Sequence, residues 1–238
     1  MKVIILAGGK GTRISEYTKE IPKPMIRIFG KPILSRIIRL YQSYNFNEII
    51  IAAGYKNYII KNYYKNKKKF SKVKVVDTGK NTMTGGRILR LKKYFNKNEN
   101  FFMTYGDGLS NINLKRLKKF HESHKKIATV TTVRPPIRFG ELSIGNKNIV
   151  KKFEEKPQLK SGWINGGFFV LNYKVFKYIK KDSTLFEREP MERLAKDKNL
   201  IAFKHHGFWK CVDTLKDKLY LDEIYKKNKK NELNKKIL

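Results

Sequence analysis

Short apolar runs alternate along this chain with stretches whose apolar residues recur at helical spacing. Each run has the length of a buried strand, and the clearest ones lie at residues 2–6, 48–53, 73–76, 101–105 and 128–133. Helical spacing occupies residues 32–44, 84–93 and 113–123, and returns from Leu215 onward. Alternation of this kind predicts an α/β fold in which helices cover both faces of a mixed, mostly parallel sheet.

Two later runs, at residues 163–171 and 201–205, look like further strands, and we expect them to be antiparallel additions to the sheet. No internal repeat and no linker rich in glycine, serine or proline divides the chain, so we predict one domain over residues 1–225. Residues 226–238 are rich in lysine and asparagine, and we expect a basic, flexible tail there.

Several classes of protein are disfavoured by what the sequence lacks. No apolar run approaches the roughly 18 residues of a membrane span, and residues 2–6 run into glycines rather than into a signal-peptide cleavage site. The single cysteine, Cys211, excludes an intramolecular disulfide and, by its number alone, a zinc site made of thiolates. We therefore expect a cytoplasmic protein.

The formal net charge of +34 at pH 7 would by itself suggest a nucleic acid or an anionic membrane as partner. However, 43 of the 54 basic residues are lysine, and they are scattered among asparagine, isoleucine, tyrosine and phenylalanine. A nucleic-acid binder more often concentrates arginine beside aromatic residues. We interpret the charge as a composition that AT-rich codons produce, and we expect no specific nucleic-acid partner. A surface for polyanions is the alternative.

A glycine-rich segment follows the first predicted strand and ends at Arg13. It consists of Leu6, Ala7, Gly8, Gly9, Lys10, Gly11 and Thr12. Glycines directly after a strand let the backbone approach a ligand, with amide groups free to bind phosphate oxygens. The segment lacks the Gly-Lys-Ser/Thr end of a P-loop and the last glycine of the dinucleotide fingerprint. Taken alone, it is better interpreted as an ordinary turn.

Arg13 is followed about ten residues later by Pro22, Lys23, Pro24 and Met25. These two blocks, at this separation, resemble the signature of sugar-phosphate nucleotidyltransferases. Further blocks resemble, in order, those of glucose-1-phosphate cytidylyltransferases, at residues 77–79, 83–87, 104–108, 138–140, 155–157, 164–170, 207–209 and 213–214. The resemblance reaches about Tyr220 and implies a single-domain, Rossmann-like nucleotidyltransferase fold.

The resemblance implies that the chain transfers a cytidylyl group from CTP to α-D-glucose 1-phosphate with Mg²⁺ as cofactor. The products would be pyrophosphate and CDP-glucose, a nucleotide sugar for cell-surface polysaccharide. The alternative is a related transferase for dTTP, UTP or GTP, or for another sugar 1-phosphate. A polyanion binder or a non-catalytic subunit on this fold is a more remote reading.

The attacking sugar-phosphate oxygen is already ionised, so this reaction requires no serine, cysteine or histidine base. The protein must instead bring two anions together and neutralise charge in an in-line transition state. Arg13 can bind the triphosphate through several N–H donors of its guanidinium, and Lys23 can lie between the phosphates. Lys156 is expected to meet the sugar 1-phosphate. Outside its motif, Lys23 would be interpreted as a solvated loop lysine.

Two aspartates are the predicted ligands of the magnesium ion. Asp107 lies between Gly106 and Gly108 directly after the apolar run at residues 101–105, where a carboxylate can reach a cation that also holds phosphate oxygens. Asp213 is the natural second ligand. The alternatives are an ordinary turn aspartate for Asp107 and the N-cap of the helix near Leu215 for Asp213.

The resemblance extends the predicted binding residues beyond the first glycine segment. Nucleotide contacts are implied at Thr84, Gly85, Gly86, Arg87, Gly106 and Asp107, with Gly85 and Gly86 letting the base lie against the backbone. The sugar pocket is implied to comprise Gly140, Glu155, Lys156, Asn165, Gly166 and Trp209. For Trp209, a place in the core is an equal alternative.

Two further features bear on partners. His121 and His124 lie three apart on a predicted helix without metal-binding spacing, so we expect them on a solvated helix face. Between Tyr63 and Val73 the chain has a short lysine-rich stretch where the family carries a longer insertion that helps subunits to pack near the nucleotide. The resemblance still implies a homo-oligomer.

Overall fold

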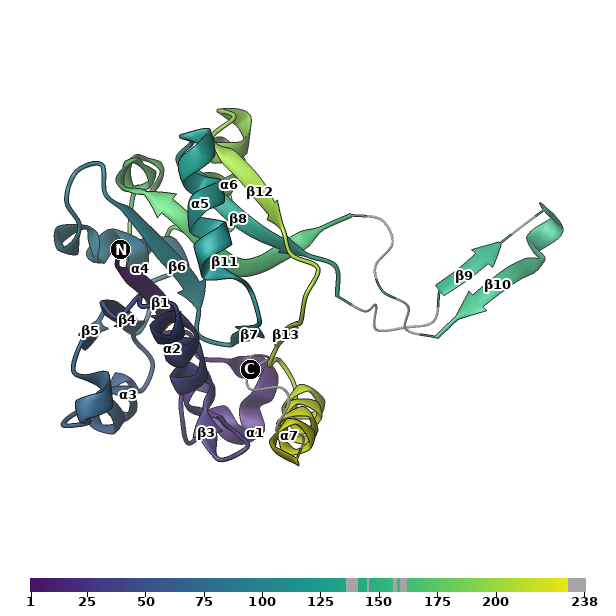
Figure 1. Cartoon of the computed structure of the whole chain (residues 1–238), viewed down its shortest axis with the longest axis horizontal. Helices are drawn as coiled ribbons and strands as arrows, with labels where there is room; N and C mark the ends of the chain where they lie inside the picture. The colour runs from purple at the N-terminus through teal and green to yellow at the C-terminus, as the bar shows by residue number, and fades with distance from the viewer. Residues whose placement is uncertain (136–140, 145, 156–157, 159–161, 231–238) are drawn as a thin grey trace.

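The computed structural model describes residues 1–135, 141–144, 146–155, 158 and 162–230 (Figure 1). Among these residues, seven strands form the main sheet in the order β12–β8–β11–β6–β1–β4–β5. Their bounds are β1 Val3–Ala7, β4 Ile49–Ala53, β5 Val73–Asp77, β6 Asn100–Tyr105, β8 Ala128–Val133, β11 Ile164–Asn172 and β12 Leu200–Lys204. Only β11 runs antiparallel to its neighbours in this sheet, which confirms the predicted α/β class with a mostly parallel sheet.

One predicted strand direction is wrong. The run at residues 201–205 is β12, and it pairs parallel with β8, with Ile201 opposite Thr129. Its direction follows from α6 (Glu189–Lys196), which precedes it and returns the chain to the edge of the sheet where β8 begins. The preceding strand β11 ends beside the start of β8, where Leu171 pairs with Ala128, and β12 begins at the same end, where Leu200 pairs with Ala128. Because both lie at one end of the sheet, β12 runs antiparallel to β11 and therefore parallel to β8.

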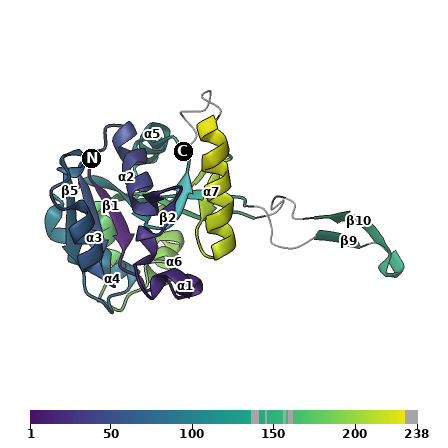
Figure 2. The same cartoon turned by 90° about the horizontal axis from the view of Figure 1, so that it is seen from below.

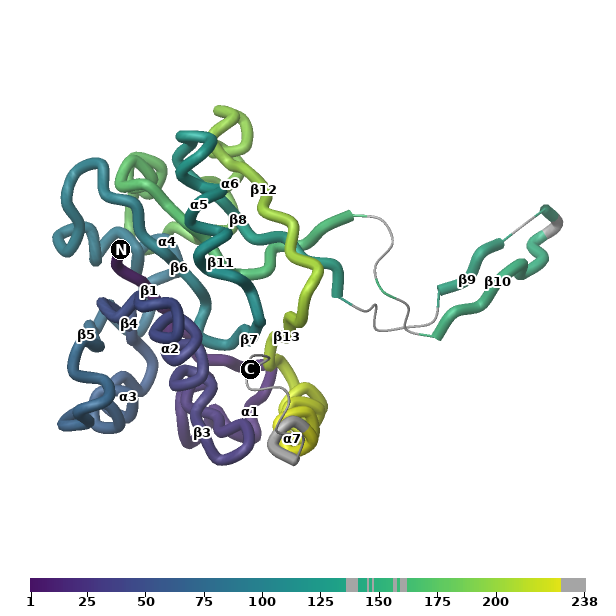
Figure 3. The backbone as a smooth tube through the Cα atoms, in the orientation of Figure 1, coloured from purple at the N-terminus to yellow at the C-terminus, as the bar shows by residue number. Residues whose placement is uncertain are grey.

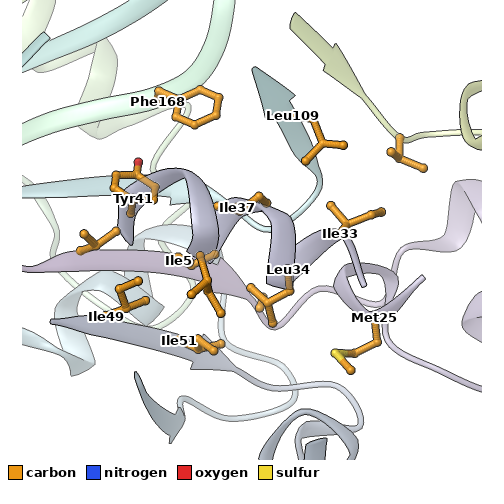
Figure 4. Close-up of a cluster of buried hydrophobic side chains, with 14 of the residues drawn as sticks. Ile5, Met25, Ile33, Leu34, Ile37, Tyr41, Ile49, Ile51, Leu109 and Phe168 are labelled. Atoms are coloured by element: carbon orange, nitrogen blue, oxygen red, sulfur yellow. The ribbon is translucent and has the colours of Figure 1, made fainter. Parts of the chain in front are cut away.

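The alternating side chains of β1 divide the core into two parts, since successive residues of a strand point to opposite faces. Val3, Ile5 and Ala7 pack into one cluster with α2 (Ile33–Ser43), α3 (Asn57–Tyr64), α5 (Leu114–His124) and α7 (Leu215–Lys230). Ile4 and Leu6 pack into the other cluster with α4 (Thr84–Arg90) and α6. Figure 4 shows Ile5, Ile49 and Ile51 of the sheet against the apolar side of α2. Because both faces are covered, the strands read as continuous apolar runs.

The remaining elements are short. They are α1 (Ser15–Thr18), the paired strands β2 (Arg27–Ile28) and β3 (Lys31–Pro32), and the antiparallel pair β7 (Gly108–Ser110) and β13 (Trp209–Cys211). The chain path in Figure 3 shows α7 returning to the N-terminal segments, where Asp222 accepts a 2.6 Å hydrogen bond from the backbone of Phe29.

A hairpin of β9 (Glu141–Ile144) and β10 (Val150–Glu154) projects from the body of the molecule in both views (Figures 1 and 2). Its antiparallel register places Leu142 opposite Phe153 and Ile144 opposite Val150. These four apolar side chains are half or more exposed. The sequence analysis does not predict this hairpin, because its strands are only four and five residues long and two of the five residues of β10 are lysine.

Helix α7 continues past Lys226 to Lys230, into the segment expected to be a tail. Residues 231–238 lie outside the described residues, so the boundary between domain and tail stays a prediction. Within the described part of the chain, no helix is both long enough and apolar enough to cross a membrane.

Candidate active site

The carboxyl ends of β1 and β6 and the beginning of β11 meet at one edge of the sheet. Leu6 pairs with Tyr105 at the end of both parallel strands, and Phe168 of the antiparallel β11 pairs with Thr104. A cavity of about 560 Å³ lies at this edge. In open α/β sheets, ligands bind outside the carboxyl ends of the strands, so this cavity is the candidate active site.

Most of the predicted site residues line this cavity. They are Leu6, Ala7, Gly8, Gly9, Gly11, Thr12, Arg13, Lys23, Thr84, Arg87, Gly106, Asp107, Asn165, Gly166, Trp209 and Asp213. Gly85, Gly86 and Glu155 are described but do not line it. Gly140, which was assigned to the sugar pocket, and Lys156, which was assigned to the sugar 1-phosphate, lie outside the described residues.

Lys23 joins two carboxylates that come from distant parts of the chain. It lies in the 3-10 turn Lys23–Met25 and is buried, and its Nζ is 2.7 Å from Oδ2 of Asp107 and 2.7 Å from Oδ1 of Asp213. Burial alone would lower the pKa of Lys23, but the two carboxylates outweigh it and raise the pKa above its ordinary value. Lys23 is therefore a charged residue of the cavity and not a solvated loop lysine.

The carboxylate of Asp213 serves the cavity and not the start of α7. Its Oδ2 accepts a 2.8 Å bond from Arg13, while Oδ1 contacts Lys23. The start of α7 is capped instead by Thr214, whose Oγ1 accepts a 3.2 Å bond from the backbone amide of Asp217. The N-cap alternative for Asp213 therefore does not describe this structure.

The short pair β7–β13 brings Asp213 next to Asp107. Cys211 pairs with Gly108, and the backbone amide of Val212 donates a 3.0 Å bond to the carbonyl of Asp107. Trp209, Cys211 and Asp213 line the cavity, as expected for alternate residues of an extended segment, and Val212 is buried in the core. The sequence analysis missed Cys211 as a cavity residue, although its spacing of two from Asp213 was the available signal.

The donor set of this corner of the cavity fits a divalent metal ion. One ligand atom from each of Asp107, Cys211 and Asp213 lies within 4.8 Å of the others. The two carboxylates supply the oxygen ligands that Mg²⁺ prefers, and they already enclose the positive charge of Lys23. Burial raises the pKa of the Cys211 thiol, so the sulfur is neutral here.

Arg87, a predicted nucleotide contact, supports the glycine segment from beneath. Its buried guanidinium donates to the carbonyls of Gly8, Ala53 and Gly79 at 3.0, 3.2 and 2.7 Å. A Cβ on Gly8 would lie 2.2 Å from this group, so only glycine lets the segment rest on it. Arg87 thus positions the backbone that a phosphate would meet, while it also borders the cavity.

Gly85 and Gly86 have a neighbour that the sequence does not indicate. A Cβ on Gly86 would lie 2.3 Å from the carbonyl oxygen of Asp182, and one on Gly85 would lie 2.8 Å from that of Thr184. The close approach that these glycines allow is therefore to another segment of the same chain. A contact between them and a base stays a prediction.

Glu187 is a second cavity residue that the sequence analysis missed, because it lies far along the chain from its partners. Its Oε1 accepts from the hydroxyl of Tyr105 at 2.7 Å and its Oε2 from that of Thr84 at 2.5 Å. On the same wall, the indole of Trp209 donates a 2.7 Å bond to the carbonyl of Gly166. Trp209 also packs against the core cluster that contains Val3 and Ile5, so it is both a wall of the cavity and part of the core.

Comparison with known proteins agrees with this geometry. A family model described as nucleotidyl transferase matches residues 2–228. Glucose-1-phosphate cytidylyltransferase of Salmonella typhimurium is 43% identical over 251 residues, which cover 96% of this chain and 97% of that protein. Mannose-1-phosphate guanylyltransferase 1 of Arabidopsis thaliana is 31% identical, and the match covers 96% of this chain and 67% of that protein.

Among solved structures, UDP-glucose pyrophosphorylase in complex with UDP-glucose superposes with a TM-score of 0.74. The match covers 95% of this chain and 98% of that one. At 18% sequence identity, this likeness concerns the fold alone.

Replacing Arg87 should reveal how much the glycine segment depends on it. In Arg87→Met, buried carbonyls of Gly8, Ala53 and Gly79 lose their donor, and each loss costs about 1–3 kcal/mol. We expect the free energy of unfolding, measured by urea denaturation, to fall by at least about 3 kcal/mol. Arg116→Met, at an exposed position of α5, is the matched control and should change little. Equal losses in the two variants would contradict the supporting role.

Proposed function

The chain belongs to the nucleotidyl transferase family, and on that premise we propose that it transfers the cytidylyl group of CTP to α-D-glucose 1-phosphate. An oxygen of the sugar phosphate attacks the α-phosphorus of CTP, and a new P–O bond forms. The bond between the α-phosphorus and the bridging oxygen breaks, and its electron pair leaves on pyrophosphate. The second product is CDP-glucose.

The observation that carries this proposal is the cluster of Lys23, Asp107 and Asp213 beside a glycine segment at the strand ends. Paired carboxylates around a buried ammonium suit a centre that holds a cation and phosphates together. A surface that merely binds polyanions has no need of such carboxylates. The identity of 43% over nearly the whole length to a cytidylyltransferase supports CTP and glucose 1-phosphate as the substrates. We also expect the chain in the cytoplasm, and cell fractionation tests this location.

Different residues of the cavity are assigned to the two anions, the triphosphate of CTP and the sugar 1-phosphate. The cavity-lining residues Gly8, Gly9, Gly11 and Thr12 offer backbone amides to the triphosphate. The exposed guanidinium of Arg13 can close over it. Lys23 contacts both carboxylates and lines the same cavity as this segment, so its ammonium can pass from Asp107 and Asp213 to phosphate oxygens. Asn165, Gly166 and Trp209 border the side assigned to the sugar. The role of Lys156 at the sugar phosphate stays a prediction.

Asp107 and Asp213 would hold Mg²⁺, which when bound supplies positive charge to the phosphates of the transition state. Asp107→Asn should therefore lower kcat by at least about a hundredfold, as loss of a major electrostatic contribution does, with the melting temperature little changed. Activity is measured as pyrophosphate release during a magnesium titration. EDTA should abolish the activity, and added magnesium should restore it.

The matched control is Asp222→Asn, since Asp222 is a carboxylate of α7 outside the cavity. This variant should retain wild-type turnover. Wild-type turnover in Asp107→Asn, or full activity in EDTA, would overturn the metal assignment.

Base selection separates this proposal from the related transferases for UTP, dTTP or GTP. Cytosine presents an amino donor and a ring-nitrogen acceptor where uracil presents an acceptor and a donor. Buried polar groups that fit cytosine would be left unpaired around uracil, at a cost of about 1–3 kcal/mol per group. In pyrophosphate release with glucose 1-phosphate, kcat/KM should be at least about tenfold higher for CTP than for UTP. Equal values would refute the cytidylyl assignment and leave the transferase assignment standing.

We further propose that copies of this chain associate through the hairpin β9–β10. Leu142, Ile144, Val150 and Phe153 share one face of it, and an isolated two-stranded hairpin is at best marginally stable in water. An apolar face on a projecting arm fits the same face of a second copy better than it fits solvent. The homo-oligomer implied by the sequence resemblance would have its contact here.

Phe153→Glu should reduce the mass measured by sedimentation velocity, because it places a charge in the apolar face. Lys152→Glu, on the opposite face of the same strand, is the control and should leave the mass unchanged. A monomeric wild type, or an unchanged mass in Phe153→Glu, would contradict association through this hairpin.

A further inference from the structure

Another cavity lies at the opposite end of the strands from the candidate active site. It has a volume of about 520 Å³ and is bordered by the first residue of β6, the last residue of β11 and the end of α5. Asn100 and Asn172 are those strand ends, whereas Leu6 and Tyr105 mark the active-site end of the sheet. The two cavities share no lining residue. We call this one the distal cavity.

His121 is the buried polar side chain of the distal cavity. It lines the cavity although only 2% of its surface is exposed. Its Nδ1 lies 2.8 Å from the hydroxyl of Thr129, whereas its Nε2 has no hydrogen-bond partner among the described residues. In this part of the chain, the fully enclosed polar side-chain atoms that lack a partner belong to Arg39, Tyr41, Asn111 and Thr131. Nε2 of His121 is not one of them, so it is open to the cavity.

A chain of hydrogen bonds fixes which nitrogen of His121 carries the proton. Burial lowers the pKa of His121 to about 4 and also lowers the pKa of His124, so both rings are neutral at pH 7. The backbone amide of Lys126 can only donate, so Nδ1 of His124, 3.0 Å away, accepts. Nε2 of His124 therefore carries the proton of that ring and donates it to the hydroxyl of Thr129 at 2.7 Å.

The hydroxyl of Thr129 completes the chain of hydrogen bonds. Within the described residues, its only other partner is Nδ1 of His121, so it donates its own proton there. The proton of the His121 ring is left on Nε2. The distal cavity therefore contains an N–H donor of a buried side chain with no acceptor.

Asn100 supplies a second donor at the distal cavity. Its Oδ1 accepts a 2.7 Å bond from Nδ2 of Asn172, whose Oδ1 accepts in turn from the backbone amide of Lys174 at 3.0 Å. Nδ2 of Asn100 has no partner in the described part of the chain, and Asn100 lines the cavity. Two N–H donors, one from α5 and one from β6, are therefore available to a ligand with acceptor oxygens.

The charge around these donors is mainly positive. Lys125, Lys126 and Lys174 line the distal cavity. The one carboxylate among its described lining residues belongs to Glu122, which forms a 2.6 Å ion pair with Lys118, one turn earlier on α5. A ligand of this cavity therefore meets an excess of ammonium groups, which favours an anion.

We propose that the distal cavity is a binding site for a phosphate group. A phosphate offers several acceptor oxygens and carries negative charge, so it can accept from both N–H donors while ammonium groups surround it. Buried donors without an acceptor are costly to a protein, and such a ligand would remove that cost. A cavity of about 520 Å³ also has room for a small molecule that carries the phosphate. The site lies apart from the active-site cavity and does not rest on the proposed function.

The test is a titration of the whole chain with inorganic phosphate, followed through the ring nitrogens of His121 by nitrogen-15 NMR. Their shifts report which nitrogen is protonated, so the free protein should show the proton of His121 on Nε2. Phosphate should shift this signal to saturation, whereas sodium chloride at the same ionic strength should not. A proton on Nδ1, or a signal that phosphate leaves in place or that chloride moves equally, would overturn the proposal.

A parallel titration with glucose 1-phosphate separates two sources of the phosphate group. Saturation of the His121 signal at a lower concentration of this ester would identify a phosphorylated small molecule as the ligand. Saturation at a lower concentration of inorganic phosphate would identify the free ion. Both results uphold the site, because both ligands carry the same group, and a failure of both would refute it.

Two lysines of the 3-10 turn Tyr173–Tyr178 separate binding in the distal cavity from a shift that is transmitted from the active site. Lys174→Gln removes an ammonium group of the cavity and should raise the phosphate concentration at half saturation by at least about threefold. Lys177→Gln, in the same turn but outside the cavity, is the matched control and should leave this concentration unchanged. Equal values in the two variants would contradict binding here, because a transmitted shift does not depend on Lys174.

Discussion

The paired contacts of Lys23 with Asp107 and Asp213 join three segments that are widely separated in sequence. Lys23 comes from a turn near the N-terminus, Asp107 follows the central strand β6, and Asp213 precedes the last helix. Two carboxylates this close repel each other unless a cation lies between them. In this structure the ammonium supplies that charge, and in the proposed reaction a metal ion and the phosphates would share the task. The same ammonium therefore neutralises the carboxylate pair in the free protein.

The rest of the site depends on the strands and the buried arginine that position the backbone around these three side chains. Parallel strands place Leu6 and Tyr105 at one edge of the sheet, and the antiparallel β11 brings Asn165 and Gly166 to the same edge. Beneath the glycine segment, Arg87 satisfies carbonyls that would otherwise be buried without a donor. The backbone of the glycine segment thus rests on a buried cation that also holds the carbonyls of Ala53 and Gly79.

Much of this could be predicted from the sequence, because doubly covered strands leave continuous apolar runs and functional residues follow their ends. Contacts between distant segments leave no such pattern. Neither β13 nor Glu187 was found, and β12 was assigned the wrong direction, since direction depends on where α6 returns the chain. His121 was expected to face solvent, but it is buried, with Nδ1 2.8 Å from the hydroxyl of Thr129. Helical spacing places it on a face of α5, yet only packing against β8 shows that this face is covered.

The central claim is that Asp107 and Asp213 hold the metal ion of the reaction and that Lys23 yields these carboxylates to it. Crystals grown with Mn²⁺ and a non-hydrolysable CTP analogue test this claim most directly, because manganese is located by its anomalous scattering. The account predicts a manganese peak bonded to both carboxylates and to phosphate oxygens, with Nζ of Lys23 moved from the carboxylates to the triphosphate. A peak away from these residues, or a Lys23 that keeps both of its 2.7 Å contacts, would contradict it.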